Sequence, residues 1–244
     1  MQIFQLEQLI YLVKKNFIKK ISKIILVNTI GKKGAKSIAE ALTENCETAE
    51  KKTDWKDMVS SIEYGITDLN LNGNNIRSEG AKYLSESVAK INTLTTFNLS
   101  ANRLEPDGVK YIADSLRSNE SIHTLFLNDN NMGTEGLKYL CDALKEAGEV
   151  KDGDEEDERC NIKHLSVRGN KLGLHAKLEN KQSGNVGMKA LRDMLKLNQK
   201  IQLLDFEDNA LCNEDMKLFC EGLKSNQSVK HLLLSSMLNN FFFY

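Results

Sequence analysis

Three adjacent copies of a 28-residue pattern constrain the fold of this chain more than any other feature of its sequence. The copies begin at Ile66, Leu94 and Ile122, and seven apolar positions and one Asn recur in register in all three. Further copies, two of them imperfect, continue the pattern at Ile162, at Ile201 and over residues 24–45 and 229–237. Such a period is typical of supersecondary units that stack on their neighbours, so the sequence predicts a solenoid of about seven units.

Each unit changes its hydrophobic period halfway along. The opening stretch alternates with period two, as at Leu69 and Leu71, which is typical of a strand. The second half spaces Gly80, Leu84 and Val88 by four residues, which is typical of a helix. Because helices are wider than the ~5 Å spacing of strands, stacked units predict a horseshoe with a parallel sheet inside and helices outside.

One Asn ends the strand of each regular unit, where the chain turns inward. An amide side chain both donates and accepts hydrogen bonds. It can therefore bond to backbone N–H and C=O groups of a loop that has left the sheet. The sequence therefore predicts a buried structural ladder of Asn74, Asn102, Asn130, Asn170 and Asn209. The alternative is a set of surface asparagines in turns. A Gly similarly opens the helical half of most units, where we expect close packing, and Asp215 departs from that pattern.

This pattern resembles the ribonuclease-inhibitor-like subfamily of leucine-rich repeats, whose longer units carry a full helix. The likeness covers residues 66–234 and, less well, residues 24–45. It implies an α/β leucine-rich-repeat solenoid, a horseshoe with the parallel sheet on the concave face and helices on the convex face. Members of that subfamily bind proteins and include GTPase activators, actin cappers and the sensor ends of receptors. The resemblance therefore implies binding without choosing a partner.

We expect a single domain over residues 1–244. Its predicted parts are an N-terminal capping helix at 1–20, repeats at 21–234 and a C-terminal tail at 235–244, with inserts at 46–65, 148–161 and 173–184. The first two inserts lie between a helix and the next strand, and the third lies between a strand and a helix. The inserts either form a rim that binds a specific partner or are sequence drift that the fold tolerates.

Four segments outside the regular repeats each allow two interpretations. The basic amphipathic N-terminal segment either caps the open end of the solenoid or lies on an anionic membrane surface. The acidic run at 152–158 is either a solvated loop or a site that attracts a basic partner or a hard cation. Trp55 either pins its insert to the solenoid or contacts a ligand. We expect Phe241 to Tyr244 to fold back over the last unit, and association through this C-terminal edge is the alternative.

Composition argues against several classes of function. Lys and Arg total 33 against 34 Asp and Glu, so a net charge of −1 gives no attraction to nucleic acid. Five Cys form no CxxC pair, which indicates a reduced, cytoplasmic compartment without a metal site. Lysines interrupt the apolar runs of the first 26 residues, so no signal peptide or membrane span is predicted. The chain has no nucleotide-binding or catalytic motif, so we expect no cofactor and no enzyme.

The residues beside the buried leucines of each strand line the concave face. They are small and polar in the N-terminal half, whereas Phe126, His164, Arg168, Asp205 and Glu207 follow in the C-terminal half. Aromatic and Arg side chains carry much of the energy of protein interfaces, so these five predict the partner-binding patch. Alternatively, Phe126 only packs on its neighbours and Arg168 pairs laterally with Glu207.

The sequence thus predicts a monomeric protein-interaction scaffold or adaptor that binds a partner protein on its concave face. Two alternatives stay open: a regulator of a small GTPase or of an actin-type cytoskeletal polymer, and a ligand-sensing fragment of a larger receptor.

Overall fold

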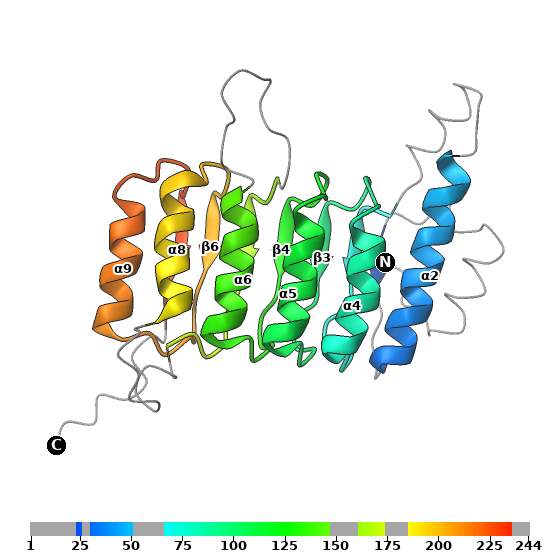
Figure 1. Ribbon diagram of the computed structural model, residues 1–244, viewed down its shortest axis with the longest axis horizontal. Coiled ribbons are helices and arrows are strands. Elements are labelled where there is room, and N and C mark those ends of the chain that lie inside the picture. The colour runs from blue at the N-terminus through cyan, green and yellow to red at the C-terminus, as the bar shows by residue number, and fades with distance from the viewer. Residues whose placement is uncertain (1–22, 26–29, 51–65, 147–160, 174–184, 236–244) are drawn as a thin grey trace.

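The computed structural model describes residues 23–25, 30–50, 66–146, 161–173 and 185–235 (Figure 1). In this part of the chain, short strands alternate with helices. The strands are β1 (Lys23–Ile25), β2 (Asp68–Asn70), β3 (Thr96–Asn98), β4 (Thr124–Phe126), β5 (His164–Ser166), β6 (Leu203–Asp205) and β7 (His231–Leu233). The helices are α2 (Gly31–Glu50), α4 (Arg77–Val88), α5 (Glu105–Leu116), α6 (Gly133–Glu146), α8 (Val186–Leu197) and α9 (Asn213–Leu223).

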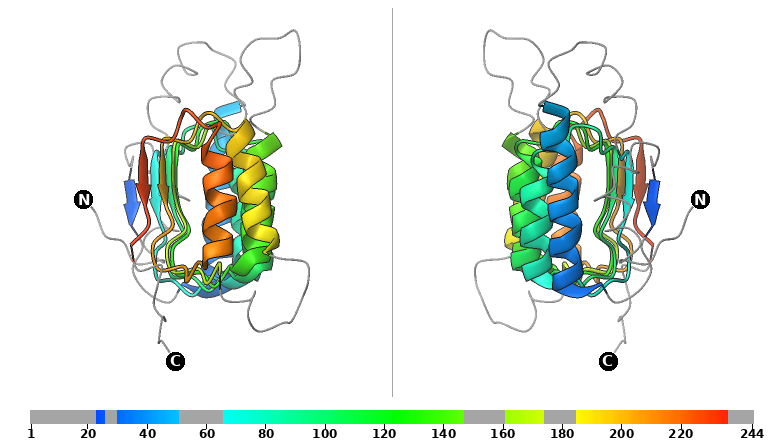
Figure 2. Two further views of the ribbon diagram at one scale, coloured as in Figure 1. Left: turned by 90° about the vertical axis from the view of Figure 1, so that its left-hand side faces the viewer. Right: turned by 90° about the vertical axis from the view of Figure 1, so that its right-hand side faces the viewer.

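The seven strands form one parallel sheet in chain order, and all the helices cover the same side of it (Figure 2). The pairing keeps the repeat position: Phe97 lies opposite Leu69 and Leu125, the equivalent residues of its neighbours. In the end-on views the middle units lie furthest toward the helices, and both ends curve toward the strand side. The predicted leucine-rich-repeat solenoid, with its sheet on the concave face, is confirmed.

One continuous core fills the space between the sheet and the helices. Leu125 in the middle of β4 and Leu127 just after it are fully buried, as is Leu140 of α6. The equivalent positions of the other central units are buried in the same way. Burying each such side chain stabilises the fold by about 1.5–3 kcal/mol. Because the layers belong to different units, this stabilisation requires that neighbours stack.

The Gly at each helix start allows adjacent helices to approach closely. A Cβ on Gly187 would lie 2.4 Å from the carbonyl oxygen of Thr134 in the preceding unit. Asp215 departs from this pattern because it makes a polar bridge instead. Its buried carboxylate accepts hydrogen bonds from the Asn185 side chain (3.0 Å) and from the backbone N–H of Cys212 (3.0 Å). Asn185 caps α8, so this bridge joins the starts of α8 and α9.

The first residues of the first predicted insert are helical. Residues 46–50 continue α2, because the stretch Glu44–Glu50 contains no Gly or Pro to end a helix. The rest of that insert, Trp55, the predicted capping helix at 1–20, the acidic run at 152–158 and the tail beyond Ser235 lie outside the described residues. None of the helices in the described part is both long and apolar enough to cross a membrane.

Candidate binding site on the inner face

The predicted ladder asparagines are fully buried where each strand ends, and they set the geometry of the inner face. Asn130 illustrates their bonding. Its Oδ1 accepts the backbone N–H groups of Asn102 (2.9 Å) and Leu104 (3.3 Å) in the preceding unit. Its Nδ2 lies 2.9 Å from the carbonyl oxygen of Leu99 and 3.0 Å from that of Leu127. One side chain therefore forms hydrogen bonds with backbone groups of two units. These groups are buried, and buried polar groups need hydrogen-bond partners.

The ladder runs without a break from Asn74 to Asn209. The backbone N–H of each member donates to the Oδ1 of the next one at 2.8–3.0 Å. Asn130 and Asn170 are 40 residues apart in the sequence, against 28 for Asn102 and Asn130, yet their bond has the same geometry. The chain between them therefore changes length without shifting the register of the inner face.

The turns around the ladder have an unusual backbone. Beside Asn130, both Asp129 and Asn131 have φ near +55°, in the left-handed region that most residues avoid. The same conformation recurs one residue before, one after or three after each ladder Asn, at Asn75, Arg77, Ala101, Arg103, Glu105, Asp129, Asn131, Lys171, Asp208 and Ala210. The hydrogen bonds between the ladder Asn side chains and the backbone offset the cost of this conformation, which is about 1–2 kcal/mol per residue.

On the inner face of the N-terminal half, polar side chains bond to their own backbone. Asn70 Oδ1 accepts the N–H of Asn72 (3.0 Å), and Asn98 Oδ1 accepts the N–H of Ser100 (2.9 Å). Each side chain closes a local turn two residues long. The side-chain amides of Asn70 and Asn98 are therefore already engaged within their own units.

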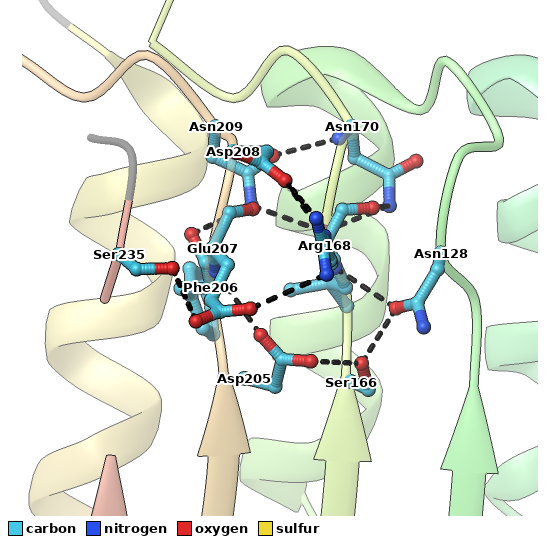
Figure 3. A network of polar contacts seen from close by, with 11 residues as sticks. Asn128, Ser166, Arg168, Asn170, Asp205, Phe206, Glu207, Asp208, Asn209 and Ser235 are labelled. Atoms are coloured by element: carbon cyan, nitrogen blue, oxygen red, sulfur yellow. Dashed lines mark hydrogen bonds and ion pairs between the residues drawn. The ribbon is translucent and has the colours of Figure 1, made fainter. Parts of the chain in front are cut away.

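The next unit loses this local turn, and its polar groups bond across strands instead. Phe126 occupies the row of Asn98, and it is half-buried. The Oδ1 of Asn128 accepts the backbone N–H of Arg168 (3.0 Å) and lies 2.6 Å from the Ser166 hydroxyl (Figure 3). The same hydroxyl lies 2.7 Å from Asp205 Oδ2. A hydroxyl carries one proton, so buried Ser166 donates to only one of these two acceptors at a time.

Arg168 lies at the centre of a group of carboxylates (Figure 3). Its Nε and Nη2 contact Asp208 Oδ2 at 2.7 and 2.5 Å, and its Nη1 lies 3.4 Å from Glu207 Oε2. The hydrogen bond to Asp208 and the charges of Asp208, Glu207 and Asp205 raise the pKa of the Arg168 guanidinium. Ser235 donates a further hydrogen bond to Glu207. The lateral pair with Glu207 is thus present, but Asp208 is the closer partner.

Asp208 is absent from the five predicted patch residues. It directly precedes ladder residue Asn209 and has φ of +55°, a conformation in which its carboxylate contacts the guanidinium of Arg168 in the neighbouring unit. The equivalent position holds Gly73, Ala101 and Gly169 in three other units, but it holds Asp129 in the fourth. A carboxylate at this position therefore does not by itself single out Asp208 in the sequence.

The structure brings three of the five predicted residues into this network: Arg168, Asp205 and Glu207. Phe126 lies opposite Ser166 in the register of β4 and β5, beside the network. His164 is exposed at the start of β5, two residues before Ser166, and takes no part in the contacts of Figure 3.

A second set of asparagines, which the sequence did not lead us to expect, ties the ends of α5, α8 and α9 to the strands that follow. Asn119 Nδ2 donates to the carbonyls of Val88 and Ile91, and its Oδ1 accepts the N–H of Ile122. Asn198 and Asn226 make equivalent bonds. Their signal is an Asn three residues before the first apolar residue of a unit.

The described residues contain no group of three His, Cys, Asp or Glu side chains that could hold a metal ion. Cys141, Cys212 and Cys220 are free thiols in this part of the chain. Burial raises the pKa of the Cys141 thiol, so that thiol stays protonated at neutral pH.

Comparison with known proteins agrees with this geometry. A family model described as Leucine Rich repeat matches three consecutive segments, residues 66–85, 90–113 and 118–141. These segments of the chain are leucine-rich repeats. The resemblance to leucine-rich repeats found in the sequence is thereby confirmed.

Solved structures similar to this chain include two domains. One is a tropomodulin C-terminal domain from Caenorhabditis elegans, 14% identical, covering 77% of this chain and 92% of that one, with a TM-score of 0.49. The other is Leiomodin-1 Actin-Binding Site 2, 16% identical, covering 74% and 88%, with a TM-score of 0.47. No curated protein matches the chain.

Proposed function

We propose that this chain is a scaffold that binds a partner protein on the inner face of its fourth to sixth units. The observation that carries the proposal is the cross-strand network around Arg168, which lies beside half-buried Phe126 on a face that no described helix covers. We define the inner-face patch as Phe126, His164, Arg168, Asp205 and Glu207. Leucine-rich repeats are a protein-interaction fold, and an aromatic residue next to an Arg is typical of interface hot spots.

The charges of the patch indicate the chemistry of the partner. Asp205, Glu207 and Asp208 place three carboxylates around the single guanidinium of Arg168. The network also lacks donors, because the one proton of Ser166 faces two acceptors. A Lys or Arg of the partner would supply both the charge and the missing donors.

Phe126 supplies the apolar part of the proposed contact. An exposed ion pair contributes only about 0–1 kcal/mol, whereas burying the exposed part of an aromatic side chain contributes up to about 3 kcal/mol. We therefore expect the partner to place an apolar side chain on Phe126 and a cationic one next to Asp205 and Glu207. The apolar contact would supply most of the affinity, and the cationic contact would fix the orientation of the partner.

The experiment is a pull-down from native cells with the full chain. A double variant, Phe126→Ala with Arg168→Ala, should lose the partner that the unchanged chain captures. The matched control, Lys110→Ala with Tyr111→Ala, removes a cation and an aromatic from the outer helix α5 and should retain it. A partner that is retained by the inner-face variant would contradict the proposal and direct attention to the inserts.

The charge requirement has its own test with the captured partner. Asp205→Asn with Glu207→Gln should weaken binding and reduce its dependence on salt, because fewer charges are screened. The identity of the partner also separates the two alternatives from the sequence. Stimulated GTP hydrolysis by a captured GTPase, or altered polymerisation of a captured filament protein, would assign a regulator, and a soluble ligand would assign a sensor fragment.

A further inference from the structure

The C-terminal end of the solenoid exposes apolar residues that are buried one unit earlier. Residues at five positions in α8 and β6 are fully buried: Met188, Leu195, Ile201, Leu204 and Phe206. The residues 28 positions later, in α9 and around β7, are only partly buried: Met216, Leu223, Val229, Leu232 and Leu234. We call these last five the terminal surface.

The difference follows directly from stacking. The residues of α8 and β6 are covered by α9 and β7, but no described element covers α9 and β7 in turn. In the described residues, backbone hydrogen bonds join β7 and its flanking residue to residues beside β6: Lys230 and His231 donate to Gln202, and Leu233 accepts from Phe206. Leu233 is itself 43% exposed. The described part of the chain therefore ends in an apolar surface next to an open sheet edge, which favours association.

We infer that residues 236–244 of this same chain pack against the terminal surface. These nine residues carry no charge, and six of them are apolar or aromatic: Met237, Leu238, Phe241, Phe242, Phe243 and Tyr244. Side chains of this kind gain most from burial against exposed Leu and Met. A run of three phenylalanines left in water would itself be an association hazard.

Distance and tethering both favour this segment over a second copy of the chain. It follows Ser235 directly, and nine extended residues reach about 30 Å at roughly 3.3 Å each, enough to pass from β7 to α9. A short tether gives an effective concentration in the millimolar range, whereas a second copy competes at its actual, usually micromolar, concentration. The inference is independent of the proposed function, because it concerns the partly buried apolar side chains of α9 and β7 and not the polar network of the inner face.

Hydrogen exchange on the unchanged full chain tests the inference first. Amides of residues 236–244 should exchange at least tenfold more slowly than in the free nonapeptide of the same sequence. Exchange at the rate of the free peptide would overturn the inference without requiring any variant.

A triple variant, Phe241→Ser with Phe242→Ser and Phe243→Ser, tests the contact from the other side. Exchange in α9 and β7 should accelerate and the Tm should fall, while exchange in α4 and α5 stays unchanged. The matched control, Asn239→Ser with Asn240→Ser, should behave like the unchanged chain. Unchanged exchange in α9 and β7 of the triple variant would overturn the inference. So would protection of these elements that disappears when the unchanged chain is diluted, because a second copy would then be the cover.

Discussion

The inner faces of the second and third units and of the fifth and sixth units share one backbone but differ in how their polar groups bond. In the first pair, Asn70 and Asn98 bond to the backbone of their own unit. In the second pair, Asp205 Oδ1 keeps this local turn by accepting the N–H of Glu207 (3.1 Å), but Asp205 Oδ2 and Arg168 also make contacts that cross strands. The ladder and the strand register are the same in both pairs. The comparison shows that the ladder bonds and the cross-strand contacts of the inner face occupy separate positions of the repeat.

Substitution of the ladder should have the largest effect and should affect both halves equally. Asn102→Ala and Asn170→Ala each leave buried backbone groups of two units unpaired, which should lower the free energy of unfolding by about 2–3 kcal/mol. Urea denaturation measures this, with exposed Asn92→Ala as the control. A cost confined to one half would show that the two halves do not share a scaffold.

Phe126→Asn should give the fourth unit the local side-chain turn that Asn70 and Asn98 form in the second and third units. The new amide can accept the N–H of Asn128, so the stability should change by less than about 1 kcal/mol. Binding of a partner on the inner-face patch should weaken at least about tenfold, the loss expected for a hot-spot aromatic. Calorimetric titration with the captured partner measures both affinities. Unchanged affinity would remove Phe126 from the patch.

Arg168→Met should make the stability of the C-terminal half sensitive to salt. The substitution leaves three carboxylates without their common cation, so the variant should be less stable than the unchanged chain at low ionic strength. The difference should shrink near about 0.5 M NaCl, because salt screens exposed charges. Arg117→Met is the control in the N-terminal half, where Arg117 pairs with Asp114 of its own helix. An equal salt dependence in both variants would contradict the special role of the network.

Gly substitutions in the ladder turns should have the smallest effect. Ala101 and Ala210 have φ of +54° and +51°, so Ala101→Gly and Ala210→Gly remove left-handed strain. The added freedom of Gly in the unfolded chain offsets part of the gain, and a net stabilisation of a few tenths of a kcal/mol is expected in each half. A thermal melt detects it as a small rise in Tm. A fall in Tm would show that these turns are not strained.

The fold could be predicted from the sequence because the same physical requirement repeats in every unit. Leu125 and Asn130 recur at fixed spacing, and a solenoid fixes which neighbour each residue meets. The contacts of Arg168 could not be predicted in this way, since the repeat fixes the left-handed backbone at Asp208 but not which side chain stands there. The bridge from Asp215 to Asn185 could not be predicted either, because Asp215 stands where most other units have a closely packed Gly.

The bond from Asn130 to Asn170 has a practical consequence for the rest of the chain. Since units on both sides of this junction stay in phase whatever lies between α6 and β5, a foreign loop or a small domain could be grafted there without re-engineering its neighbours. Natural variation has the same freedom, and new binding elements can arise at this junction while the geometry of the inner face stays the same.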